Sequence, residues 1–339
     1  MSTGPRRSPH GRSAVLYLSA ALLASTAAGW YTFGGEEPSG PGAAPGTGSA
    51  AVPSWSRDLP WPAEGQSSAE VEGLGSLGTR GEQTPVPIAS ITKVMTAYVI
   101  LTHHPLSADE QGTEVTADRQ AADESYSATE STAPLVADRH YTQRQLLELM
   151  MLPSGNNVAR LLARWDAGSQ EEFAKKMNKA ASELGMDRTI YTGASGMEPS
   201  TKSTAADQLK LARAVMKNEA FRQIVATPSL TAPGTGAQIR NSNRLLGQDG
   251  VIGLKTGSST PAGGNLMWAA TENIEGTPRL ILGVVLHQQA GTHPAQAMTA
   301  AFDASHTLIT AIRNALPPTL TPGPGVPAKG AALGRSGGR

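Results

Sequence analysis

A serine and a lysine three residues apart, Ser90 and Lys93, form the first pair in the sequence that could do chemistry. Residues at this spacing share one face of a helix, so the Lys93 amine can sit beside the Ser90 hydroxyl. A serine hydroxyl is a weak nucleophile until a neighbouring base takes its proton. Lysine can be that base when burial or a second cation keeps it neutral part of the time. The pair therefore predicts a serine nucleophile with a lysine base, or, more simply, a helix-capping serine and a solvated lysine.

A second triplet, Ser154-Gly155-Asn156, follows an apolar segment that ends in Pro153. The Ser154 hydroxyl could relay a proton between lysine amines and a leaving group, and the Asn156 amide could hold a substrate carbonyl. On its own, the triplet is equally typical of a polar turn.

The third triplet is Lys255-Thr256-Gly257, at the end of an apolar strand. Lys255 would present a cation to an anionic substrate and lower the pKa of the other lysine. Thr256 offers a hydroxyl to a carboxylate, and Gly257 allows close approach of a backbone. Taken alone, a lysine on an edge strand before a turn glycine is unremarkable. The three triplets together, in this order, indicate one active site.

Periodicity predicts the elements that must hold these residues. Apolar residues recur at helical spacing after Ser90, which is the expected cap of that helix. Further helices are expected over 142–152, 157–165, 171–184, 205–217 and 295–316, and strands over 69–77, 250–255, 265–271 and 280–287. This order predicts an α+β fold, a mainly antiparallel sheet flanked by helices with a helical insertion after the first strand.

Composition excludes several classes of function. The chain has no cysteine, which removes disulfides, thiolate metal sites and a cysteine nucleophile. Lys plus Arg and Asp plus Glu are balanced at 28 each, so nothing favours nucleic acid as a partner. The dipeptide His103-His104, before Pro105, is expected in a solvated loop without a partner.

The N-terminus indicates export. Arg6, Arg7 and Arg12 precede an uncharged run over 14–33, which is typical of a signal peptide and almost long enough to span a bilayer. A cleaved signal and a retained membrane anchor both remain open, and either places the protein outside the cytoplasm, secreted or anchored at the cell envelope. The expected organisation is a signal peptide or anchor (1–33), a Gly/Pro/Ser-rich linker (34–64), a catalytic domain (65–316) and a disordered tail (317–339).

The three triplets resemble the Ser-x-x-Lys, Ser-x-Asn and Lys-Thr-Gly motifs of penicillin-binding proteins and serine β-lactamases. Within that superfamily the chain is similar to the low-molecular-mass penicillin-binding proteins, the serine-type D-alanyl-D-alanine carboxypeptidases of peptidase family S11. The similar segments are 88–96, 154–159, 194–197, 203–207, 241–246 and 253–257. The resemblance covers about 86–285 and implies a β-lactamase/transpeptidase-like fold.

The resemblance also implies roles. Ser90 would attack the carbonyl between the two terminal D-alanines of a peptidoglycan stem peptide, with Lys93 as base. Ser154 and Lys255 would pass the proton to the departing D-alanine, and the backbone N–H groups of Ser90 and Ser258 would form the oxyanion hole. The residues implied to bind substrate are Asn156, Lys255, Thr256, Gly257 and Ser258. β-Lactam antibiotics would be covalent inhibitors, and no metal or cofactor is implied.

The sequence departs from the family pattern at two places. No Asp-x-x-Thr-Gly turn precedes Ser90, so the sequence does not decide whether the N-terminal pair of strands forms. The segment 287–294 lacks the arginine that the family places near the substrate carboxylate, and His293 is the residue that could replace it.

The sequence allows three other functions: a D,D-endopeptidase of the same family, a class A-like β-lactamase and a catalytically idle peptidoglycan-binding module. The β-lactamase is disfavoured by Gly155 and by the absence of a Glu-x-x-Leu-Asn loop. The idle module is disfavoured because binding alone needs no nucleophile paired with a base.

Overall fold

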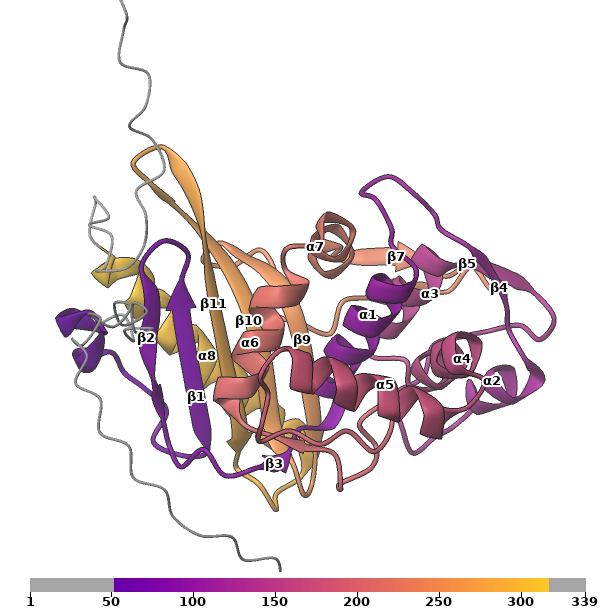
Figure 1. Ribbon diagram of the computed structural model, residues 1–339, viewed down its shortest axis with the longest axis horizontal. Coiled ribbons are helices and arrows are strands. Elements are labelled where there is room, and N and C mark those ends of the chain that lie inside the picture. The colour runs from indigo at the N-terminus through magenta and orange to yellow at the C-terminus, as the bar shows by residue number, and fades with distance from the viewer. Residues whose placement is uncertain (1–51, 317–339) are drawn as a thin grey trace, which may run out of the picture. The chain divides into compact units, whose positions relative to one another are not determined.

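A five-stranded sheet organises the part of the chain that the computed structural model describes, residues 52–316. The strand order is β2-β1-β11-β10-β9, and every neighbouring pair is antiparallel (Figure 1). The strands are β1 (Gln66–Val71), β2 (Gly75–Arg80), β9 (Val251–Ser259), β10 (Gly263–Ile274) and β11 (Thr277–Gln288). The expected α+β class with an antiparallel sheet is confirmed.

The N-terminal strand pair is present, although it differs from the sequence prediction. The single strand expected over 69–77 was wrong, because the chain reverses there between β1 and β2. Gly73 and Gly75 adopt φ values of 85° and 87°, a backbone region that favours glycine and allows the tight reversal.

Both faces of the sheet are buried. Successive side chains of a strand point to opposite faces, and β10 sends Leu266 and Trp268 to one hydrophobic cluster and Met267 and Ala269 to another. Helix α8 (Pro294–Ala315) covers the first face, and α6 (Ala205–Val215) packs against β11 and β1 (Figure 1). Burial on both faces explains why these strands have continuous apolar runs in the sequence.

A helical region lies between β2 and β9 in the sequence. Besides α6, its helices are α1 (Thr92–His103), α2 (Arg119–Glu124), α3 (Gln143–Met151), α4 (Asn156–Ala167), α5 (Gln170–Glu183) and α7 (Glu219–Ala226). Three small antiparallel pairs accompany them: β3 (Val86–Pro87) with β6 (Lys202–Ser203), β4 (Glu114–Thr116) with β5 (His140–Thr142), and β7 (Ser229–Thr231) with β8 (Gln238–Arg240). The sequence analysis missed α2, α7 and these pairs, which are too short for periodicity to reveal.

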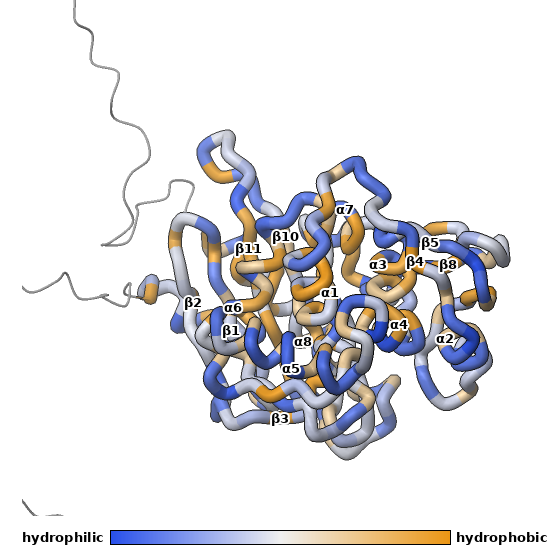
Figure 2. Tube along the Cα trace, turned by 45° about the vertical axis from the view of Figure 1, so that its right-hand side comes forward, coloured by the Kyte–Doolittle hydropathy of each residue, from blue (hydrophilic) through white to orange (hydrophobic). Residues whose placement is uncertain are grey.

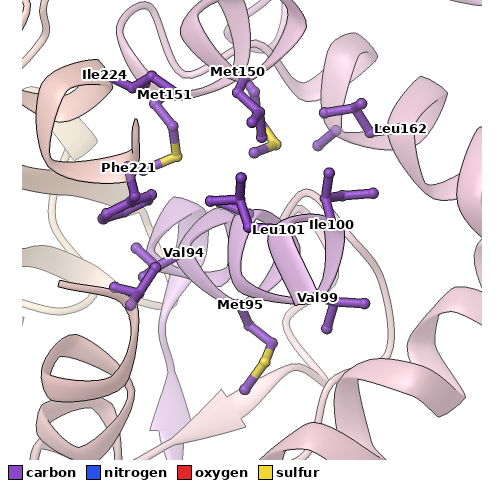
Figure 3. Close-up of a cluster of buried hydrophobic side chains, with 14 of the residues drawn as sticks. Val94, Met95, Val99, Ile100, Leu101, Met150, Met151, Leu162, Phe221 and Ile224 are labelled. Atoms are coloured by element: carbon purple, nitrogen blue, oxygen red, sulfur yellow. The ribbon is translucent and has the colours of Figure 1, made fainter. Parts of the chain in front are cut away.

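Helix α1 is the core of the helical region. Its apolar residues are buried on several sides, and Figure 2 shows it as one of the most hydrophobic segments of the chain. Figure 3 shows this packing: Val94, Ile100 and Leu101 of α1 face the side chains of other helices, and Met95 and Val99 point to the opposite side of α1. The facing side chains are Met150, Met151, Leu162, Phe221 and Ile224. A helix held from all sides is a rigid support for the residues at its N-terminal end.

The C-terminal end of α1 is held by contacts with a buried carboxylate, where the sequence predicted a loop without a partner. His103 is the last residue of the helix, and its Nδ1 lies 2.9 Å from Oδ1 of Asp166. His104 Nε2 lies 3.0 Å from the same oxygen, and Lys176 Nζ lies 2.8 Å from Oδ2. The Asp166 side chain is 1% exposed. The expectation of a partnerless loop was wrong, because α4 and α5 supply a shared carboxylate and a cation at this point.

Part of the predicted domain organisation lies outside the described residues, namely 1–33, most of the linker and 317–339. Residues 54–58 form a 3-10 helix, η1 (Ser54–Asp58), and Trp55, Leu59 and Trp61 pack against the cluster under α8. Folded structure therefore begins before residue 65, because these three large apolar side chains find a surface to cover. Within residues 52–316, no helix has the length and apolarity needed to cross a bilayer.

We predict that Asp166→Ala lowers the free energy of unfolding by about 1–3 kcal/mol, because it removes the shared partner of three donors. Burial opposes ionisation of Asp166, but hydrogen bonds from Lys176 and His103 outweigh it and lower the pKa of this carboxyl. Its contribution is therefore present above the pKa of the unfolded carboxyl and is lost as pH falls through the lower folded pKa.

Urea unfolding at neutral and acid pH measures both effects. The control is Lys179→Ala, which breaks a pair with Glu183 whose lysine is 75% exposed and should change stability by less than about 0.5 kcal/mol. Equal losses in the two variants would contradict the prediction.

Candidate active site

Ser90 lies in a tight turn directly before α1. The turn is the 3-10 helix η2 (Ala89–Ile91), and Ala89 has φ 46°, a left-handed conformation uncommon for a residue other than glycine. Thr92 Oγ1 donates to the Ala89 carbonyl at 2.7 Å and holds this turn. The prediction that Ser90 caps the helix was wrong, since Ile91 is the N-cap and no side chain caps it. The Ser90 hydroxyl is thus not used for capping.

The predicted contact between Lys93 and Ser90 is present. Lys93 Nζ lies 2.9 Å from Ser90 Oγ, 2.5 Å from Asn156 Oδ1 and 2.7 Å from the Ser195 carbonyl oxygen. The two carbonyl oxygens can only accept hydrogen bonds. An uncharged amine would give its two N–H groups to them, and its lone pair would remain for the Ser90 hydroxyl.

Electrostatics favour that uncharged amine. Lys93 is 0% exposed, and burial is the largest cause that lowers its pKa well below the ordinary lysine value. The positive charges of Lys255 and Arg160 lower it further, while Glu130 and Glu198 act in the opposite direction.

The second triplet forms the turn between α3 and α4. Ser154 has φ 67°, and a Cβ on Gly155 would lie 2.7 Å from the Leu149 carbonyl oxygen, so only glycine fits there. Asn156 begins α4 and brings the turn to Lys93. The Ser154 Oγ is buried and has no hydrogen-bond partner among residues 52–316, so no hydrogen bond joins it to either lysine.

The third triplet lies on β9, directly against the turn that holds Ser90. A Cβ on Gly257 would lie 2.9 Å from the backbone nitrogens of Ser90 and Ile91, so a larger residue would push the strand away. Thr256 Oγ1 lies 2.8 Å from Ser242 Oγ, a contact that the sequence analysis did not anticipate. Ser258 follows on the same strand and is half-buried.

Lys255 is 1% exposed, and its Nζ donates to the carbonyl of Thr256 at 2.9 Å. Burial lowers the pKa of Lys255 to about 7. At neutral pH, the Lys255 amine is therefore protonated only part of the time. When it is protonated, its charge lowers the pKa of Lys93, as the sequence suggested.

A loop over 194–197 closes another side of the site. Its Ser195 carbonyl accepts from Lys93, and a Cβ on Gly196 would overlap the Ala89 carbonyl. The segment resembled its family counterpart, but the role of the Ser195 carbonyl could not be read from a side-chain pattern.

Two charged residues of the site were also missed. Asn156 Nδ2 donates to Glu130 Oε2 at 2.7 Å, and Arg160 binds the same carboxylate at 2.7 Å. Arg160 follows Asn156 by four residues on α4, so helical spacing could have found it. Glu130 lies in a loop and gave no local signal.

His293, suggested as a replacement for the missing arginine, is the N-cap of α8. Its Nδ1 accepts from the backbone N–H of Ala295 at 3.3 Å. This nitrogen is therefore engaged in capping the helix.

Comparison with known proteins agrees with this geometry. The family model of peptidase family S11, D-alanyl-D-alanine carboxypeptidase, matches residues 76–289. The chain belongs to this family. Members of family S11 are serine-type D-Ala-D-Ala carboxypeptidases, so the chain is a serine-type hydrolase of this family.

Sequence alignments with relatives in family S11 span most of the folded part of the chain. A D-alanyl-D-alanine carboxypeptidase of Streptomyces sp. strain K15 is 35% identical over 227 residues, which are 62% of this chain and 76% of that protein. The carboxypeptidase DacB2 of Mycobacterium tuberculosis is 34% identical over 230 residues, 66% of this chain and 75% of that protein. The crystal structure of the Streptomyces K15 DD-transpeptidase has a TM-score of 0.62 at 32% identity, covering 72% of this chain and 95% of that one. The similarity supports the β-lactamase/transpeptidase-like fold expected from the sequence.

We predict that Lys255→Met weakens the pH dependence of stability. Its folded pKa of about 7 lies below the ordinary value of 10.5, so the unfolded chain binds more protons between these values. Lys255 therefore makes the free energy of unfolding rise with pH between about 7 and 10.5. Below pH 7 the buried amine is protonated, and the full cost of burying its charge destabilises the fold.

Urea unfolding across the lower half of the window should give wild type a slope steeper by about 1.4 kcal/mol per pH unit than Lys255→Met. The exposed Lys179→Met is the control and should keep the wild-type slope. Identical slopes for wild type and Lys255→Met would refute the lowered pKa of Lys255.

Proposed function

We propose that this protein is a serine-type D-alanyl-D-alanine carboxypeptidase that removes the terminal D-alanine from peptidoglycan stem peptides through an acyl-enzyme on Ser90. The observation that carries the proposal is the 2.9 Å distance between Lys93 Nζ and Ser90 Oγ at a fully buried amine. A solvated lysine would be protonated and could not act as a base, whereas burial beside a second lysine favours the neutral form.

In the acylation step, Lys93 takes the proton of the Ser90 hydroxyl while Oγ bonds to the carbonyl carbon between the two D-alanines. The backbone N–H groups of Ser90 and Ser258 hold the negative oxygen of the tetrahedral intermediate. The C–N bond then breaks, and the departing D-alanine amine receives a proton passed through Ser154 and Lys255. The unpartnered Ser154 Oγ supports this role, because a buried hydroxyl needs a partner that substrate can supply.

In the deacylation step, water attacks the ester carbonyl, releases the shortened stem peptide and returns the proton to Ser90. β-Lactam antibiotics would acylate the same Ser90 Oγ by opening their ring. No metal or organic cofactor enters either step.

Substrate is held by the second and third triplets. The Asn156 amide donates to a stem-peptide carbonyl, and Lys255 with Thr256 binds the terminal carboxylate. Since β9 is at the edge of the sheet, an extended peptide can pair with its backbone beside Gly257 and Ser258. A protein acting on peptidoglycan works outside the cytoplasm, with 1–33 as its export signal or membrane anchor and 65–316 as its catalytic domain.

Mass spectrometry after incubation with penicillin tests this proposal. We expect a penicilloyl mass on the Ser90 peptide of wild type and none in Ser90→Ala. Absence of the adduct in wild type would contradict the proposed acyl-enzyme on Ser90 and favour an idle peptidoglycan-binding module, whereas rapid hydrolysis of a chromogenic cephalosporin would favour a β-lactamase. Release of D-alanine from a monomeric pentapeptide, rather than cleavage of a cross-linked dimer, separates the carboxypeptidase from a D,D-endopeptidase.

We further predict that Lys93→Ala reduces the rate of acylation by penicillin roughly 10²- to 10⁴-fold, the usual contribution of a general base. Circular dichroism should show that the variant remains folded, and the exposed Lys179→Ala should acylate like wild type. Normal labelling of a folded Lys93→Ala protein would exclude Lys93 as the base.

A further inference from the structure

The orientation of the Asn156 amide decides what Lys93 can do. Asn156 Oδ1 faces Lys93 Nζ at 2.5 Å, and Nδ2 faces Glu130 Oε2 at 2.7 Å. An ionised carboxylate can only accept hydrogen bonds, so the nitrogen end of the amide must point toward Glu130. Its oxygen end must then point toward Lys93.

A flipped amide would obstruct the base. With Nδ2 turned toward Lys93, its N–H would donate to the lone pair of the neutral amine, the same lone pair that must accept the Ser90 proton. Only the observed orientation gives Lys93 two acceptors, Asn156 Oδ1 and the Ser195 carbonyl, and leaves the lone pair for Ser90. It also leaves the second N–H of Nδ2 with no acceptor among residues 52–316, ready for a substrate carbonyl.

Glu130 is itself fixed from two directions. Arg160 binds it through two nitrogens, at 2.7 Å to Oε1 and 3.1 Å to Oε2, and these side chains are only 12% and 14% exposed. The loop that carries Glu130 is anchored by Asn157, whose amide exchanges hydrogen bonds with the backbone of Ala133 at 3.0 and 2.9 Å. Asn156 N also donates to the Ser131 carbonyl at 2.9 Å.

We propose that Glu130, held by Arg160, is a positioning residue for the reaction: it fixes the Asn156 amide so that Lys93 keeps its lone pair for Ser90. This inference rests on the proposed function, because it presupposes that Lys93 is the base. It assigns to Glu130 no contact with the reacting atoms.

Glu130 also contributes a charge to the site. Its negative charge opposes the effects of burial, Lys255 and Arg160 on the pKa of Lys93, as does that of Glu198. Replacing Glu130 by a neutral residue therefore lowers the pKa of Lys93 and extends the active, unprotonated base to lower pH. A residue that only stabilised the fold would not move the pH profile.

Glu124 provides a matched control. Its Oε2 accepts from Arg160 Nε at 2.8 Å, so it shares the guanidinium with Glu130. Among the described contacts, it has none with Asn156. Glu124→Gln thus removes a carboxylate from the same ion-pair cluster without releasing the amide.

The experiment measures the second-order rate constant of acylation by penicillin against pH for the full chain and three variants. Glu130→Gln keeps an oxygen that can accept from Asn156, so its plateau should stay within about threefold of wild type while the acid limb moves roughly 0.5–2 pH units lower. Glu130→Ala removes the acceptor, and its plateau should fall roughly 10- to 100-fold. Glu124→Gln should change neither.

An unshifted acid limb in Glu130→Gln, or an equal shift in Glu124→Gln, would overturn the proposal. Should Glu130→Ala not fold, as judged by circular dichroism, the polar but shorter Glu130→Ser takes its place, with the same expected fall of the plateau. Wild type that acylates at Ser90 while a folded Glu130→Ala keeps the wild-type plateau would refute only the positioning role, whereas wild type that forms no adduct would refute the proposed function as well.

Discussion

The constraint on which the rest of the site depends is the burial of two lysine amines, Lys93 and Lys255, whose charges act on each other. Lys93 and Lys255 are 0% and 1% exposed, and neither would keep an ordinary lysine pKa in such surroundings. Holding them there requires rigid elements: on one side a helix buried among other helices, and on the other the edge strand β9 of a sheet whose two faces are covered. The fold keeps both amines buried and holds Lys93 beside Ser90.

The acceptors around Lys93 are as important as its burial. Asn156 and Ser195 each present an oxygen, which directs the amine toward the serine hydroxyl. Arginine and glutamate groups behind Asn156 balance each other's charge, so the nearby cation does not become an uncompensated buried charge. The contacts among Asn156, Glu130 and Arg160 thus orient the Lys93 amine and also influence its pKa. They link α4 to the loop that carries Glu130.

The sequence predicted the elements whose signals are local. The spacing of Ser90 and Lys93 foretold their contact, and the long helices and C-terminal strands followed from apolar periodicity. Glu130 could not be found in this way, because its partners lie 26 and 30 residues further along and only the folded loop brings them together. The prediction that His103 and His104 have no partner was wrong for the same reason, since Asp166 reaches them from another helix. The prediction that Ser90 caps α1 was wrong because Ser90 lies within a 3-10 turn that precedes the α-helix.

The overlap that a side chain at Gly196 would make with the Ala89 carbonyl has a consequence for how this site can diverge. Position 196 and the left-handed turn at Ala89 are interlocked, so a bulkier residue at 196 is tolerated only if the turn that holds Ser90 is rebuilt at the same time. Variants that change specificity by single substitutions should therefore arise at the rim of the site, and a homologous protein that lacks this glycine should have a differently shaped turn at the position of Ser90.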